Sequence, residues 1–159
     1  MDTLAASLEL IRAQLNAALQ AAEPRAEDWV ILTNVIGQDG VLFEDARDKV
    51  AMMLVNIASD ATLRAAPNPA GLPTMRLDLL VAFVANFENR DYAKGLTAIS
   101  RTIAFFRQTP VFTAPGAGAA TLTMVAADLS LEHVGGVMAM LGLRYCPSVF
   151  YRLRGVSAG

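Results

Sequence analysis

The sequence predicts an α+β protein in which helices pack on a mixed, largely antiparallel sheet. Three segments have helical apolar periodicity, about five short runs read as strands, and the segments follow one another in the order α-β-β-β-α-β-α-β. No internal repeat and no linker divides the 159 residues, a length that suits one hydrophobic core. We therefore expect a single domain, residues 1–159, with about five strands and three helices.

Two of the three helices are predicted from amphipathic stripes. The first covers about residues 3–21, and its stripe consists of Leu4, Leu8, Ile11, Leu15 and Leu19. The second covers about residues 89–108, and its stripe consists of Tyr92, Leu96, Ile99, Ile103 and Phe106. It should end before Pro110, because the residue preceding a proline avoids the helical region.

The third predicted helix begins after Ser130, a good N-cap residue, and ends at Gly142, which suits the C-terminal cap. Its apolar stripe is Leu131, Val134, Met138 and Leu141. Two glycines, Gly135 and Gly136, interrupt it, and each weakens a helix by about 1 kcal/mol relative to alanine. We expect close packing against a neighbouring backbone to be the reason for them.

Strands are predicted over residues 29–37, 50–57, 74–87, 121–129 and 148–154. The last strand has one apolar face and one mostly basic face, and its place at the end of the chain suggests a position at a sheet edge. The strand and helix periods together predict one core. Its expected members are Met53, Val55, Ile57, Leu79, Val81, Phe83 and Leu153, with Leu96, Ile99, Ile103 and Phe106 packed on them.

Composition argues against several classes of partner. The net charge is −2, with acidic and basic residues interspersed, so we expect neither nucleic-acid binding nor a polybasic membrane patch. The longest charge-free run, 108–127, contains prolines and glycines, which excludes a membrane-inserted helix there. The N-terminal residues do not resemble a signal peptide, so we expect cytoplasmic synthesis. Apolar residues make up 54% of the chain, and the excess suits subunit interfaces.

Chemical motifs are few. Cys146 and His133 are the single cysteine and the single histidine, and a catalytic thiol would need a nearby base and a lowered pKa. A lone cysteine is more often a small buried hydrophobic residue than a catalytic one. A histidine in the first turn of a helix is more often solvated or partly packed than catalytic. No metal-ligand cluster and no phosphate-binding loop occurs. We therefore expect no cofactor and no enzymatic activity.

Four phrases, read together, resemble one family over nearly the whole chain. They are "LVNIASDATLR" (54–64), "DLLVAFVANF" (78–87), "YAKGLTAISRTIAFFRQTPVFTAP" (92–115) and "LEHVGGVMAMLGLRYCPSVFYRLRG" (131–155). The chain resembles the terminal cap proteins of phage-tail-like contractile injection systems, which are similar to phage tail terminators. The resemblance implies a tail-terminator-like fold and a six-fold ring of this chain. That ring ends the inner tube and joins it to the last sheath ring at the distal end of the particle.

Two other hypotheses remain beside a structural cap: a tail completion protein of a true phage, and a small enzyme or ligand-binding domain that uses Cys146 and His133. For the cap, contact surfaces are expected in the loops 38–49, 65–73 and 113–120 and on the basic face of the last strand. The candidate interface residues are Asp45, Arg47, Asp48, Arg64, Arg76, Asp78, Arg152 and Arg154.

Overall fold

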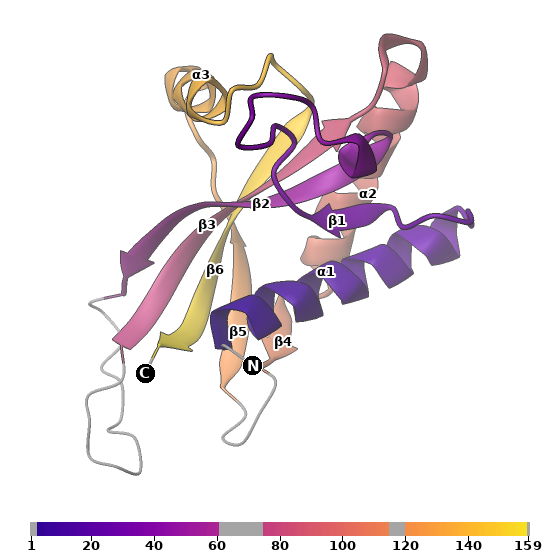
Figure 1. Ribbon diagram of the computed structural model, residues 1–159. Coiled ribbons are helices and arrows are strands. Elements are labelled where there is room, and N and C mark those ends of the chain that lie inside the picture. Colours follow the sequence, from indigo (N-terminus) through magenta and orange to yellow (C-terminus); the bar gives the residue numbers. More distant parts are fainter. Residues whose placement is uncertain (1–2, 61–74, 115–119, 159) are drawn as a thin grey trace.

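A computed structural model describes residues 3–60, 75–114 and 120–158 of the chain. Three helices, α1 (Thr3–Ala22), α2 (Tyr92–Gln108) and α3 (Leu131–Met140), pack around a curled sheet (Figure 1). The strands of the sheet are β1 (Val30–Leu32), β2 (Lys49–Ser59), β3 (Met75–Asn86), β4 (Val111–Thr113), β5 (Thr121–Ala126) and β6 (Ser148–Ala158). Short 3-10 turns, η1 (Glu44–Ala46) and η2 (Asn89–Asp91), precede β2 and α2. The predicted α+β class is confirmed, with six strands in the described part of the chain instead of about five.

The strands lie in the order β1-β2-β3-β6-β5-β4. β1 pairs with β2 in parallel, and every other neighbouring pair is antiparallel, so the mixed, largely antiparallel sheet is confirmed. β6 is bonded to β3 on one side and to β5 on the other. The expected edge position of the last strand is therefore wrong. Its apolar face carries Tyr151 and Leu153, which are buried in the main core, and its interior place pairs its backbone on both sides.

The largest differences between the predicted and the observed strands concern β1 and β4, while β5 ends at Ala126 and β6 continues to Ala158. The predicted strand 29–37 is reduced to β1, because the chain turns back after Leu32 and Ile36 forms an isolated bridge with Leu42. β4 was not predicted at all, since it has only three residues and follows Pro110 directly. Its register with β5 pairs Phe112 with Leu122, and both side chains are buried. A three-residue segment with one buried aromatic side chain is too short to show the alternation that predicts a strand.

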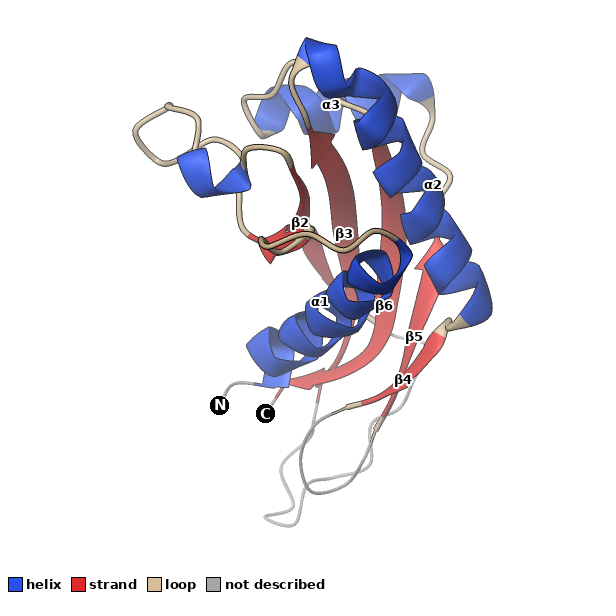
Figure 2. Cartoon of the chain, turned by 90° about the vertical axis from the view of Figure 1, so that its right-hand side faces the viewer, coloured by secondary structure: helices blue, strands red, loops and turns tan. Residues whose placement is uncertain are grey.

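The main core lies on the face of the sheet that α1 and α2 cover (Figure 2). The predicted α1 stripe is confirmed, since Leu8, Ile11, Leu15 and Leu19 are all buried. At the centre, the Phe106 ring of α2 lies 5.1 Å from that of Phe83 and 4.7 Å from that of Tyr151, measured between centroids. Aromatic pairs at such distances add to the stabilisation from area burial.

Most of the residues predicted for the core are buried: Met53, Leu79, Val81, Phe83, Ile99, Phe106 and Leu153. The prediction of one core is wrong, however, because Met53 belongs to a separate cluster on the other face of the sheet. Val55 is partly buried, whereas the prediction was wrong for Ile57, Leu96 and Ile103, which are 51%, 45% and 38% exposed. Ile57 follows a register shift between Leu54 and Asn56, which breaks the period-two alternation of β2 on which the prediction rested. α2 buries Gly95, Ala98 and Thr102 instead. Small residues let a helix approach a sheet closely, and this rotation turns Leu96 and Ile103 outward.

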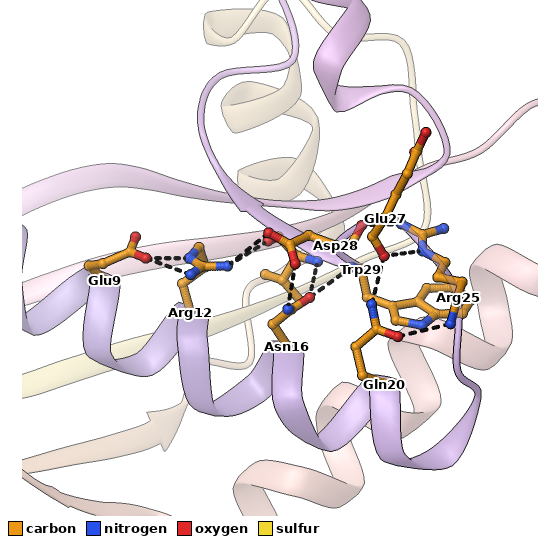
Figure 3. A network of polar contacts seen from close by, with 9 residues as sticks. Glu9, Arg12, Asn16, Gln20, Arg25, Glu27, Asp28 and Trp29 are labelled. Carbon is orange, nitrogen blue, oxygen red and sulfur yellow. Dashed lines mark hydrogen bonds and ion pairs between the residues drawn. The ribbon is translucent and has the colours of Figure 1, made fainter.

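A polar network holds the chain between α1 and β1 against the helix (Figure 3). The amide oxygen of Asn16 accepts hydrogen bonds from the backbone N–H groups of Trp29 and Val30, at 2.7 and 3.1 Å. Its amide nitrogen donates to Asp28 at 2.8 Å, and the Arg25 guanidinium stacks on the Trp29 ring at 4.0 Å. These contacts aim β1 along β2, so the parallel pair depends on side chains of the first helix.

A second, smaller core occupies part of the opposite face of the sheet. It consists of Val35, Ala51, Met53, Ala82, Val84, Met138 and Phe150, with partly buried neighbours from α3 and the loop around residues 36–42. α3 therefore lies across the sheet from α1 and α2, as Figures 1 and 2 show. The two faces of the sheet thus differ: one is covered by two helices, and the other is covered only in part.

Candidate interface surfaces

Four of the predicted interface residues meet on the partly covered face. Arg76 and Asp78 alternate along β3 with buried Leu77 and point away from α1 and α2. Arg152 and Arg154 alternate along β6 with buried Leu153 and lie on the same face of the sheet as Asp78. The register places Arg154 opposite Asp78. Tertiary structure therefore joins residues far apart in the sequence. We call this group, together with Asp60, the charged sheet surface.

Ion pairs and hydrogen bonds organise the charged sheet surface. Nη2 of Arg154 lies 2.9 Å from Oδ2 of Asp60, whose side chain is only 4% exposed. Nη1 of Arg152 lies 3.5 Å from Oδ1 of Asp78. The third arginine, Arg76, donates a hydrogen bond from Nη1 to the backbone carbonyl oxygen of Gly155 at 2.9 Å. Asp60 was missed from sequence, and its position directly after β2 was the one signal that could have found it.

The bulge at Gly155 aligns these side chains. The β3–β6 register shifts between Leu77 and Asp78, and Gly155 adopts φ 95°, a conformation that favours glycine. A Cβ atom at this position would overlap the backbone carbonyl oxygen of Thr121. The extra residue lets Arg154 lie on the charged sheet surface while Val156 returns to the main core.

The other predicted residues lie at the opposite end of β2 and β3. Arg47 binds Glu44 at 3.0 Å and Glu88 at 2.8 Å. The hydrogen bond to Arg47 lowers the pKa of the Glu44 carboxyl. Asp48 adopts φ 55° and its backbone N–H donates to Asn86, while Asp45 is exposed. This charged loop is separate from the charged sheet surface.

Arg64 and the loop 65–73 lie outside the described residues, as does most of the loop 113–120.

The surface of α3 is apolar and mostly exposed. Leu131 is 86% exposed and Met140 is 64% exposed, and Met138 is the one fully buried residue of this helix. The predicted caps are confirmed, since Ser130 accepts a hydrogen bond from the His133 N–H and Gly142 has φ 69°. The stripe prediction was wrong for Leu131, because α3 contacts the sheet mainly through the side that carries Met138.

Among the described residues, neither helix glycine packs closely against a neighbouring backbone. A Cβ atom at Gly135 or Gly136 would meet nothing within 4 Å among the described residues, so the expected close packing is wrong within one subunit. Gly136 instead lines an open groove of about 520 Å³ between α3 and β3. Its other lining residues are Leu80, Leu129, Glu132, His133, Val137 and Met140.

The geometry around Cys146 does not match an activated thiol. Its Sγ is in contact with the backbone oxygen of Arg144 at 3.5 Å, and burial raises the pKa of the Cys146 thiol. A catalytic thiolate needs a lowered pKa. His133 is exposed on α3, and no hydrogen bond links it to Cys146 in the described chain.

Within residues 3–60, 75–114 and 120–158, no group of three or more histidine, cysteine, aspartate or glutamate side chains is arranged to bind a metal ion. In the same part of the chain, every helix is too short or too polar to cross a bilayer.

The sheet topology and its helices define the chain as an α+β protein with a mixed, largely antiparallel sheet. Residues 8–158 match the model of the Pvc16 N-terminal domain family, so the chain belongs to that family. The resemblance to cap proteins of contractile injection systems is thereby confirmed. A comparison with curated protein sequences finds no match.

Among solved structures, the fold is similar to the sheath/tube terminator, in the extended state, of the extracellular contractile injection system PVC. The TM-score is 0.51 at 19% sequence identity, over 92% of this chain and 56% of the other. The chain thus spans about half the length of that terminator. At this identity the likeness establishes the fold.

Proposed function

We propose that the chain is a structural assembly protein, a six-fold cap that ends the inner tube of a contractile injection system and joins it to the last sheath ring. Membership of the Pvc16 N-terminal domain family over residues 8–158 is the observation that carries the proposal. The similar fold of a sheath/tube terminator supports it. In this role the partners are other copies of the chain, the tube protein and the sheath protein, and the site of action is the particle end.

The surfaces of the subunit are compatible with such a cap. A ring subunit on a tube needs separate patches for its neighbours, the tube and the sheath. The charged loop at Asp45–Asp48 lies at the end of β2 and β3 away from the charged sheet surface. The groove beside α3 lies on the same sheet face as the charged sheet surface and adjoins it at Leu80, which pairs with Arg152. Exposed apolar patches of this kind generally mark contact sites.

Deletion of the protein from cells that make the particle tests the role. We expect tubes and sheaths of irregular length without a cap density at the distal end by electron microscopy, and rescue by the intact chain. Capped particles of normal length in the deletion strain would contradict the proposal.

A further inference from the structure

We infer that the groove beside α3 binds the exposed apolar stripe of α2 from a second copy of this chain, and that repetition of this contact closes the ring. The inference rests on the proposed function and names the subunit surfaces that a cap would use.

The receiving surface is the groove between α3 and β3. Most of its lining side chains, Leu80, Val137 and Met140 among them, are apolar, and Met140 is 64% exposed. Gly136 leaves the α3 backbone bare, since a Cβ atom there would meet nothing within 4 Å among the described residues. A bare helix backbone lets another helix approach closely, which would explain a glycine that weakens α3 at a position with open space beside it.

The inserted surface is the stripe of α2 formed by Tyr92, Leu96 and Ile103. These side chains are 46%, 45% and 38% exposed, and their spacing of four and seven residues places them on one side of the helix. Arg107, four residues beyond Ile103, continues the same side and is exposed. The stripe therefore ends in a positive charge.

The charges of the two helices favour a contact between α2 of one subunit and α3 of another over an α2–α2 or an α3–α3 contact. α2 carries Lys94, Arg101 and Arg107 and no acidic residue, whereas the only charged side chain of α3 is Glu132. Neither Arg107 nor Glu132 forms an ion pair with another described residue. Complementary charges fix the register of an interface, and like charges oppose the alternative pairings.

The two surfaces lie on opposite faces of the sheet. α2 packs on the main core through Ala98 and Phe106, and α3 packs on the second core through Met138. One subunit cannot bring them together, and a pair joined groove to stripe still presents one free groove and one free stripe. Such head-to-tail contacts continue until a rotation closes them into a ring.

Disulfide trapping in the purified chain tests the contact, in a Cys146→Ser background that removes the native thiol. The variant with both Leu96→Cys and Gly136→Cys should form a ladder of covalent multimers on mild oxidation. A mixture of the two single variants should stop at covalent dimers. The control replaces Leu96→Cys by Thr97→Cys, which is exposed on the same helix but about 100° around it, and it should not form the ladder.

Charge reversal provides a second readout that does not depend on new cysteines. Glu132→Arg or Arg107→Glu alone should weaken self-association at least about tenfold in sedimentation, because each variant opposes like charges. The two changes combined should restore most of the association. A combined variant as weak as its weaker parent would overturn the inference.

The other outcomes are equally decisive. Dimers from Gly136→Cys alone would indicate an α3–α3 contact, and a chain that stays monomeric without cross-links would exclude this surface pair. Glu132→Arg subunits that still cap particles would overturn the contact and leave the cap role intact. Loss of capping on deletion of the chain tests that role separately.

Discussion

Arg154 of β6 reaches across β3 to Asp60, and the Nη2 and Oδ2 atoms of the two side chains lie 2.9 Å apart. The Asp60 side chain is 4% exposed and that of Arg154 is 41% exposed. The pair therefore ties the end of β2 to the far side of the β3–β6 ladder. It distinguishes the two arginines of the final strand, which the sequence presents as equivalent.

The first prediction separates those arginines. Arg154→Glu should lower the free energy of unfolding by about 1–3 kcal/mol, because the nearly buried Asp60 carboxylate would then face a second carboxylate. Arg152→Glu should lower it by less than about 1 kcal/mol, since Arg152 is half exposed and 3.5 Å from Asp78. Urea unfolding measures both, and equal effects would contradict the role of Asp60.

Because Arg152→Glu should disturb the fold less than Arg154→Glu, it is the better variant for testing whether the charged sheet surface docks on particle ends. We expect the folded Arg152→Glu protein to cap fewer particles, counted by electron microscopy, if the charged sheet surface contacts tube or sheath. Undiminished capping would exclude Arg152 from that contact.

A third prediction concerns the main core. Phe83→Ala or Phe106→Ala should each lower the free energy of unfolding by about 3–5 kcal/mol, because each ring is buried and its removal leaves a cavity. Leu96→Ala, on the exposed side of α2, is the matched control and should lower it by less than about 1 kcal/mol. Either phenylalanine variant retaining full stability would show that the core is assigned wrongly.

The fourth prediction compares two glycines. Gly155→Ala should destabilise the protein strongly, because the left-handed φ and the overlap with Thr121 both oppose a side chain. Gly135→Ala should stabilise it by up to about 1 kcal/mol, since this helix position has open space for a Cβ atom. Thermal unfolding measures both changes. A stable Gly155→Ala protein would argue against the bulge in β6.

The fifth prediction concerns the thiol. Burial raises the pKa of Cys146 above its ordinary value of 9.0, so the folded protein keeps the proton to higher pH than the unfolded chain does. This preference stabilises the fold below the unfolded pKa, and the stabilisation is lost as pH rises through the folded pKa. Stability should fall more steeply in this alkaline range for the native chain than for Cys146→Ser.

Labelling of Cys146 at neutral pH should likewise be slow in the folded protein and fast after unfolding. Fast labelling of the native chain would favour the enzymatic hypothesis instead.

The sequence by itself determined the α+β class, most strand and helix ranges and most of the core. Helical and strand periods alone locate such features, because each buried side chain must follow the geometry of its own element. Leu8, Ile11, Leu15 and Leu19, for example, define α1 before any fold is known. Local chemistry was sufficient for the caps at Ser130 and Gly142 as well.

Tertiary structure alone decided which strands are neighbours in the sheet and which apolar side chains remain exposed to solvent. Periodicity cannot show that β6 lies inside the sheet, that α2 turns Leu96 outward to bury Gly95, or that Asp60 meets Arg154. These outcomes depend on contacts between segments far apart in the chain, where close packing and paired backbone groups select one arrangement from several with the same local pattern.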